Sequence, residues 1–151
     1  MQTTAEARQQ LLDELADATD EIGVALAALG AAYEQLDTHR ADELEEGLFR
    51  PVQLAYGRAT RIHSGFAERH GLAQRKFETG SPGLASIGAK GFIDRAVEAV
   101  GRADTALATL QDSMLPVEVG DPELRAALAG LRELVGSFDV HARELVRTIG
   151  R

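Results

Sequence analysis

The sequence predicts an all-α fold, an antiparallel four-helix bundle in up-down-up-down order with a Gly-rich loop between helices 2 and 3. Three observations support this prediction. Apolar residues recur at alternating spacings of three and four, which is the seam of a long helix packed on other helices. Four such stretches are separated by turn residues, and no strand-like pattern competes with them. A single antiparallel bundle buries all four apolar faces.

Composition narrows the class of protein. A chain of 151 residues is long enough for one domain with a real core, and 44% hydrophobic with 26% charged residues is ordinary for a globular protein. The absence of cysteine excludes disulfides, thiolate metal sites and cysteine nucleophiles. No apolar run approaches the ~20 residues needed to cross a bilayer. With a polar start after Met1 and no signal peptide, the expected location is cytoplasmic.

The first helix is expected over residues 4–36, with Thr3 or Thr4 as its N-cap. Alanine lines one edge of its seam, which lets a neighbouring helix approach closely. Polar and charged residues interrupt the seam at 37–40, so a turn is expected there. The seam consists of Leu11, Leu15, Ala18, Ile22, Ala25, Leu29, Ala32 and Leu36.

The second helix is expected over residues 41–73, where the seam resumes at Leu48 and continues to Phe66. Pro51 lies inside this stretch. A proline within a helix removes one backbone hydrogen bond and clashes with the preceding turn. We therefore expect a kink or a restart near Leu48 to Pro51.

Glycine, serine and proline are concentrated between residues 74 and 91, which predicts a flexible loop. The third helix is expected over 91–114 on an apolar face that includes Ile93, Val100 and Leu107. The run Asp121-Pro122-Glu123 combines a cap, a proline for the first turn and an acid. It predicts the start of the fourth helix, expected over 121–149.

Charge is distributed unevenly along the chain. Residues 1–46 carry 12 acids and 2 bases, whereas residues 47–76 carry 1 acid and 6 bases. One interpretation is an anion-binding site formed by Arg58, Arg61 and Arg69. We favour pairing of these arginines with the acids of a folded-back first helix. The overall charge of −8 disfavours nucleic-acid binding.

An acidic row on the first helix, Asp13, Asp17 and Glu21, is spaced four residues apart and therefore shares one helix face. Hard-cation binding is conceivable for such a row. We favour a solvated or arginine-paired surface.

An aromatic and imidazole ribbon follows the second helix at Phe49, Tyr56, His63 and His70, every seven residues. Residues seven apart are separated by ~10.5 Å along a helix, so His63 and His70 cannot hold one metal ion together. The favoured interpretation is a wider buried face or a face that docks a second subunit. A ligand cavity, or a metal or haem site, would need partners from other helices. The ligand or interface candidates are Tyr33, Phe49, Tyr56, His63, His70 and His141.

Enzyme signatures are mostly absent. A di-iron carboxylate bundle needs Glu-x-x-His pairs on two helices, and the chain has none. The glycines around Lys90 do not match a phosphate-binding loop, because no Ser or Thr follows the lysine and no strand precedes the loop. No catalytic residue, metal ligand or cofactor is therefore predicted, and an enzyme is disfavoured.

We therefore expect a small non-catalytic interaction or accessory module that self-associates or binds a protein partner, without nucleic-acid or membrane partners. The main alternative is a bundle that holds a small molecule or a metal between its helices. An anion-binding sensor that uses the three arginines ranks third.

Overall fold

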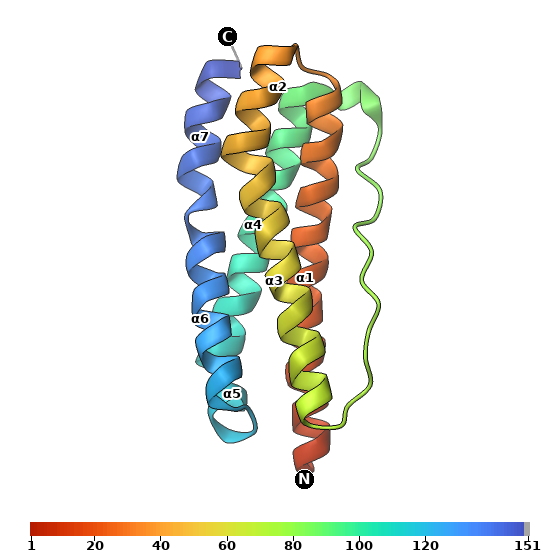
Figure 1. The fold of residues 1–151 in the computed structure, drawn as a ribbon, viewed down its shortest axis with the longest axis vertical. Coiled ribbons are helices and arrows are strands. Elements are labelled where there is room, and N and C mark those ends of the chain that lie inside the picture. The colour runs from red at the N-terminus through yellow and green to blue at the C-terminus, as the bar shows by residue number, and fades with distance from the viewer. Residues whose placement is uncertain (150–151) are drawn as a thin grey trace.

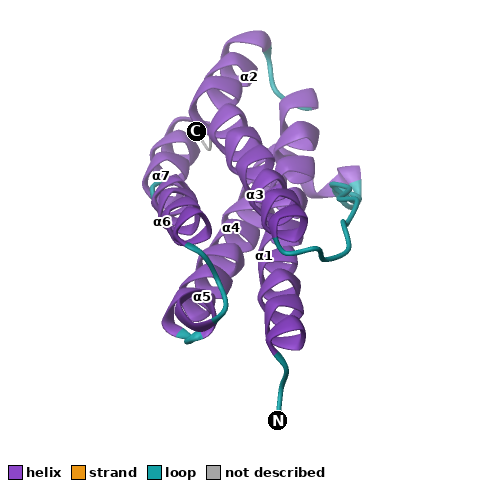
Figure 2. Cartoon of the chain, turned by 60° about the horizontal axis from the view of Figure 1, so that its bottom comes forward, coloured by secondary structure: helices purple, strands orange, loops and turns teal. Residues whose placement is uncertain are grey.

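The computed structural model describes residues 1–149, and every regular element in this range is a helix (Figures 1 and 2). The predicted all-α class is therefore confirmed. No helix within these residues is long and apolar enough to span a membrane. The elements are α1 (Thr4–Glu34), α2 (Thr38–Leu44), the π-helical η1 (Glu45–Phe49), α3 (Arg50–Arg69), the 3-10 helix η2 (Ala85–Ile87), α4 (Gly88–Asp112), α5 (Leu115–Glu118), α6 (Pro122–Gly136) and α7 (Phe138–Ile149).

The path of the chain differs from the predicted up-down-up-down order. α1 runs the length of the molecule, and α2, η1 and α3 return antiparallel to it (Figure 1). Residues 71–84 then run, without helix, from the end of α3 to the end of the molecule where α1 finishes. As a result α4 also runs antiparallel to α1 and therefore parallel to α3. Two contacts fix this direction: Gln35 Nε2 donates to the Ala85 carbonyl at 2.9 Å, and Arg102 pairs with Glu21 at 2.8 Å. The observed order is up-down-down-up.

The length of the non-helical segment explains this path. Residues 71–84, which we call the strap, can span about 45 Å when extended. The 31 residues of α1 rise about 46 Å. The strap is thus long enough to connect opposite ends of the molecule, and it runs along the helices (Figure 1).

α1 begins with a capping box in which Thr3 accepts from the Glu6 amide and the Glu6 carboxylate accepts from the Thr3 amide. Its alanine edge packs chiefly against α4, which presents buried alanines of its own. Small side chains on both helices allow close approach of the two backbones. The buried alanines are Ala18, Ala25 and Ala32 on α1, with Ala96, Ala99 and Ala103 on α4.

The second predicted helix is divided near Pro51, where a kink or a restart was expected. Asp37 caps α2 by accepting from the Arg40 amide, and the chain then widens into η1 before Pro51 takes its place at the start of α3. Pro51 has no backbone N–H and cannot donate the regular α-helical hydrogen bond to the preceding turn. The wider π-helical turn before it accommodates the loss of that bond. The helix also ends at Arg69 and not at residue 73, because Gly71 adopts φ 67° and Leu72 N–H bonds to the Ala67 carbonyl.

The fourth predicted helix is divided as well, into α6 and α7 at Ser137, and α5 lies in the expected connector. The two interruptions meet at one level of the core, where Pro51, Val52 and Phe138 line an apolar void of about 10 Å³. This void is too small to hold an organic ligand.

Candidate functional site

The predicted ribbon begins at Phe49 in η1, continues along α3 and ends at His70 just after it, and its first part faces α1 of the same chain. A Cβ atom placed on Gly23 would lie 3.1 Å from Tyr56 Cε1, and one on Gly30 would lie 3.9 Å from Phe49 Cε2. The seven-residue spacing of the ribbon therefore matches a seven-residue spacing of glycines on antiparallel α1. His63 is only 3% exposed, while Phe49 and Tyr56 are half-buried.

The strap covers this part of the α1–α3 junction. Arg75 pairs with Asp20 of α1 at 2.8 Å, and Gln74 Nε2 donates to the Ser64 carbonyl of α3 at 3.0 Å. The Phe77 ring meets the His63 ring edge-on, with 5.1 Å between the centroids, and the Arg75 guanidinium lies 5.0 Å from the Phe77 centroid. These contacts hold the strap to both helices by side chains.

Within residues 1–149, two polar atoms beneath the strap have no hydrogen-bond partner, the Tyr56 hydroxyl and His63 Nδ1. Buried polar groups are nearly always paired, and an unpaired one costs about 1–3 kcal/mol. The strap backbone also lies close to Gly23, since a Cβ atom placed on this glycine would be 3.4 Å from Thr79 Cα. We call Asp20, Gly23, Tyr56 and His63, as they lie under the strap, the covered site.

Burial shifts the pKa of each unpaired group in the direction that favours its uncharged form. Burial raises the pKa of Tyr56, and the nearby carboxylates of Asp20 and Glu78 raise it further. Burial lowers the pKa of His63, Arg75 lowers it too, and Asp13 opposes them. The covered site therefore offers one hydroxyl donor and one neutral imidazole nitrogen.

The lowered pKa of His63 predicts a dependence of stability on pH. The unfolded chain binds a proton at His63 near pH 6.5, before the folded chain does, so this contribution to stability is complete above that pH and is lost as the pH falls below it. Relative to a His63→Leu variant, the free energy of unfolding of the wild type should decline between pH 7 and pH 5, by at most about 1.4 kcal/mol per pH unit. Urea titrations across this range would measure it, and a constant difference between the two proteins would contradict it.

Close packing at Gly23 predicts that a larger residue there disturbs the covered site. Gly23→Val should destabilise the protein by about 1 kcal/mol, because its side chain overlaps Tyr56 and the strap backbone. Gly101→Val on α4 is the matched control, since an added Cβ there meets nothing within 4 Å. Thermal unfolding compares the two variants, and equal melting temperatures would show that the strap yields without cost.

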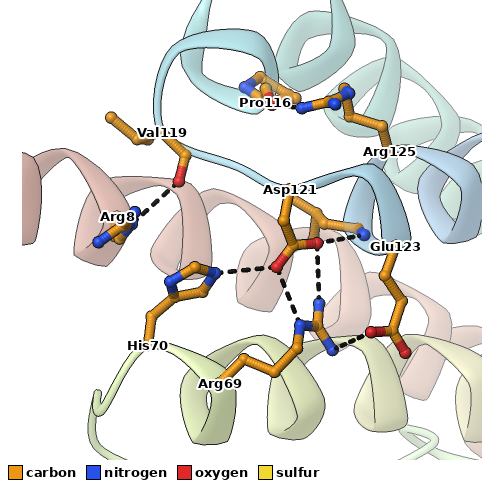
Figure 3. A network of polar contacts seen from close by, with 9 residues as sticks. Arg8, Arg69, His70, Pro116, Val119, Asp121, Glu123 and Arg125 are labelled. Carbon is orange, nitrogen blue, oxygen red and sulfur yellow. Dashed lines mark hydrogen bonds and ion pairs between the residues drawn. The ribbon is translucent and has the colours of Figure 1, made fainter.

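At the end of α3, Arg69 and His70 converge on Asp121, the N-cap of α6 (Figure 3). Arg69 donates two hydrogen bonds to the carboxylate, at 2.9 and 3.1 Å, and His70 Nε2 lies 2.8 Å from Oδ2. The Leu124 amide donates to Oδ1 at 2.7 Å, and Arg69 also reaches Glu123 at 3.1 Å. We call Arg69, His70, Asp121 and Glu123 the clasp.

The clasp holds a charged carboxylate in a partly buried place. Burial acts to raise the pKa of Asp121, but the hydrogen bonds from Arg69, the Leu124 amide and His70 outweigh it and lower that pKa well below its usual range. Arg69 and His70, at the end of α3, both bond to the carboxylate that caps α6, so the contacts are those of a structural joint between α3 and α6.

The other predicted site residues do not join the ribbon. Tyr33 is exposed near the end of α1, and His141 is exposed on α7 in a shallow groove lined by Glu43, Glu46 and Glu144. The proposed ligand set of Tyr33, Tyr56, His63, His70 and His141 is therefore not brought together. Among residues 1–149, no group of three or more histidine and acidic side chains is arranged to hold a metal ion.

The predicted charge pairing is wrong in its partners. In the described part of the chain, Arg58 and Arg61 are exposed and take part in no ion pair, and Arg69 pairs with Asp121 and Glu123. The acids of α1 that do pair use Arg75 of the strap and Arg102 of α4 instead. The strap and α4 both lie against α1, and their path was not foreseen, so the arginines of α3 were assigned the wrong partners.

Sequence reasoning also missed Arg75 and Phe77, which lie in a stretch expected to be a flexible loop. Their only signal is that the strap places a basic and an aromatic residue among small and polar ones. No protein-family model, curated protein or solved structure matches this chain.

Proposed function

We propose that the chain is a non-catalytic binding module whose ligand reaches the covered site when the strap lifts. The observation that carries this proposal is the pair of unpartnered polar atoms, Tyr56 Oη and His63 Nδ1, beneath a non-helical segment. A ligand that replaced the strap could satisfy both atoms, which the strap does not.

Few contacts oppose such a movement. Arg75 and Asp20 are each about half exposed, so their ion pair adds little stability. Within residues 1–149, no backbone–backbone hydrogen bond joins the strap to α1. Local opening of a segment like this requires much less free energy than global unfolding.

We favour a protein partner over a small molecule as the ligand, because the covered site is a surface of side chains and not an enclosed cavity. Self-association through the ribbon or α1 is not favoured, since α3, α4 and the strap cover those surfaces within one chain. We also propose that the fold is a four-helix bundle, in which α2–α3 and α6–α7 each count as one interrupted helix. The proposed location is cytoplasmic.

Cysteine labelling tests whether the strap opens by itself, because the chain has no other thiol. His63→Cys places a thiol under Phe77, and Ala59→Cys places one at a fully buried position elsewhere on α3. The His63→Cys thiol should react under native conditions at least tenfold faster than the Ala59→Cys thiol. A further Phe77→Ala change should accelerate labelling of the first thiol only. Equal rates at the two positions would show that the site opens only by global unfolding and would overturn the proposal.

A further inference from the structure

The strap shows which chemistry fits the covered site, because it is itself an extended segment bound there. Its Arg75 side chain meets Asp20, and its Phe77 ring, two residues later, meets His63. Arg75 also lies over the Phe77 ring, so the cation and the aromatic group form one unit.

Charge on α1 favours the same type of ligand. Asp13, Asp17 and Asp20 are spaced by four and three residues, so they share one helix face. Within residues 1–149, Asp13 and Asp17 take part in no ion pair, and Asp20 pairs only with Arg75. If the strap lifts, Arg75 leaves and the carboxylates of this helix face remain, with Asp20 near enough to act on Tyr56 and Asp13 near enough to act on His63. Such a surface attracts a basic segment and repels an acidic one.

We infer that the covered site binds an extended segment of a partner protein that carries a basic residue two positions before an aromatic residue, and that the strap competes with it. This inference rests on the proposed function. The partner's basic side chain takes the place of Arg75 on Asp20, and its aromatic ring takes the place of Phe77 on His63. Its backbone carbonyls or polar side chains can accept from the Tyr56 hydroxyl, which the strap leaves unpaired.

Competition from the strap sets the affinity of the intact protein. A tethered segment is present at an effective concentration of about 1 mM, so a free peptide of similar chemistry binds the wild type weakly. A variant that weakens the strap but keeps the α1 and α3 residues beneath it should therefore bind the free peptide more tightly. Arg75→Ala with Phe77→Ala does this, since both side chains belong to the strap and neither belongs to α1 or α3.

The probe is a fluorescein-labelled peptide with the sequence of residues 72–84, LAQRKFETGSPGL. Fluorescence anisotropy should show that it binds the Arg75→Ala/Phe77→Ala variant at least tenfold more tightly than it binds the wild type. Lys76→Ala is the matched control, because Lys76 is an exposed strap residue between the other two. That variant should bind the peptide as weakly as the wild type does. Circular dichroism confirms that each variant remains helical.

Peptide variants test the recognition itself. Replacing either the arginine or the phenylalanine of the peptide by alanine should weaken its binding to the Arg75→Ala/Phe77→Ala variant at least tenfold. If these replacements leave the affinity of the peptide for the variant unchanged, or if the peptide does not bind the variant at all, the inference about the partner is overturned. The labelling experiment on His63→Cys is independent of the peptide. If that thiol still reacts by local opening, the covered site stands and only the chemistry of its ligand is wrong.

Discussion

Replacing Asp121 by alanine should lower the free energy of unfolding by about 2–3 kcal/mol, the largest loss that we expect from a single polar side chain. About 1 kcal/mol comes from the lost N-cap of α6. Most of the rest comes from the charge-assisted bonds of Arg69 and His70 to a carboxylate that is only 19% exposed. Arg69 keeps Glu123, which limits the loss. Urea unfolding followed by circular dichroism measures the change.

Two comparisons isolate the clasp. Asp37→Ala removes an N-cap of the same chemistry whose carboxylate is largely exposed and, within residues 1–149, contacts only Arg40. It should therefore lower stability by about 1 kcal/mol or less. The Asp121 contribution is complete above pH 4 and is lost as the pH falls below it, because folding lowers the pKa of this carboxyl. Similar losses for the two alanine variants at pH 7 would show that Asp121 acts as a cap alone.

The sequence contained enough information for the helices but not for their order. The spacing of Leu15, Ile22 and Leu29 indicates a buried helix face, and all three are buried in α1. The direction of α4 depends on whether residues 71–84 form a short turn or run the length of the molecule. Glycine and proline content cannot decide this, because both kinds of segment avoid helix for the same reasons.

The candidate site was predictable to the same extent. Seven-residue spacing places Tyr56 and His63 on one face of α3, and the structure has them there. What covers that face is a long-range contact with Phe77 that no local pattern encodes. Asp121 was likewise identified as a helix start from its neighbours. Its pairing with Arg69 and His70 follows only from where α3 ends against α6.

The two unpartnered groups of the covered site lead to a second large effect, a gain of stability. Tyr56→Phe with His63→Leu should raise the free energy of unfolding by about 1–2 kcal/mol. Each replacement removes a buried polar atom that lacks a partner and keeps most of the shape of the side chain. The loss of the edge-on contact with Phe77 offsets part of the gain. Gains of this kind are typical where residues serve binding at the expense of stability.

Controls for this pair come from exposed residues of the same types. Tyr33→Phe and His141→Leu change a hydroxyl and an imidazole that solvent can reach, so each should alter stability by no more than about 0.5 kcal/mol. A gain shared by these controls would reflect a general effect of apolar substitution and not the covered site.

The most direct test of a site that is kept for a ligand is the free energy of unfolding of Tyr56→Phe/His63→Leu beside the wild type, in urea at pH 7. We predict that the variant has the higher midpoint with an unchanged slope. A lower midpoint would mean that the hydroxyl and the imidazole already stabilise the free protein, and this would contradict a covered site whose polar atoms await a partner.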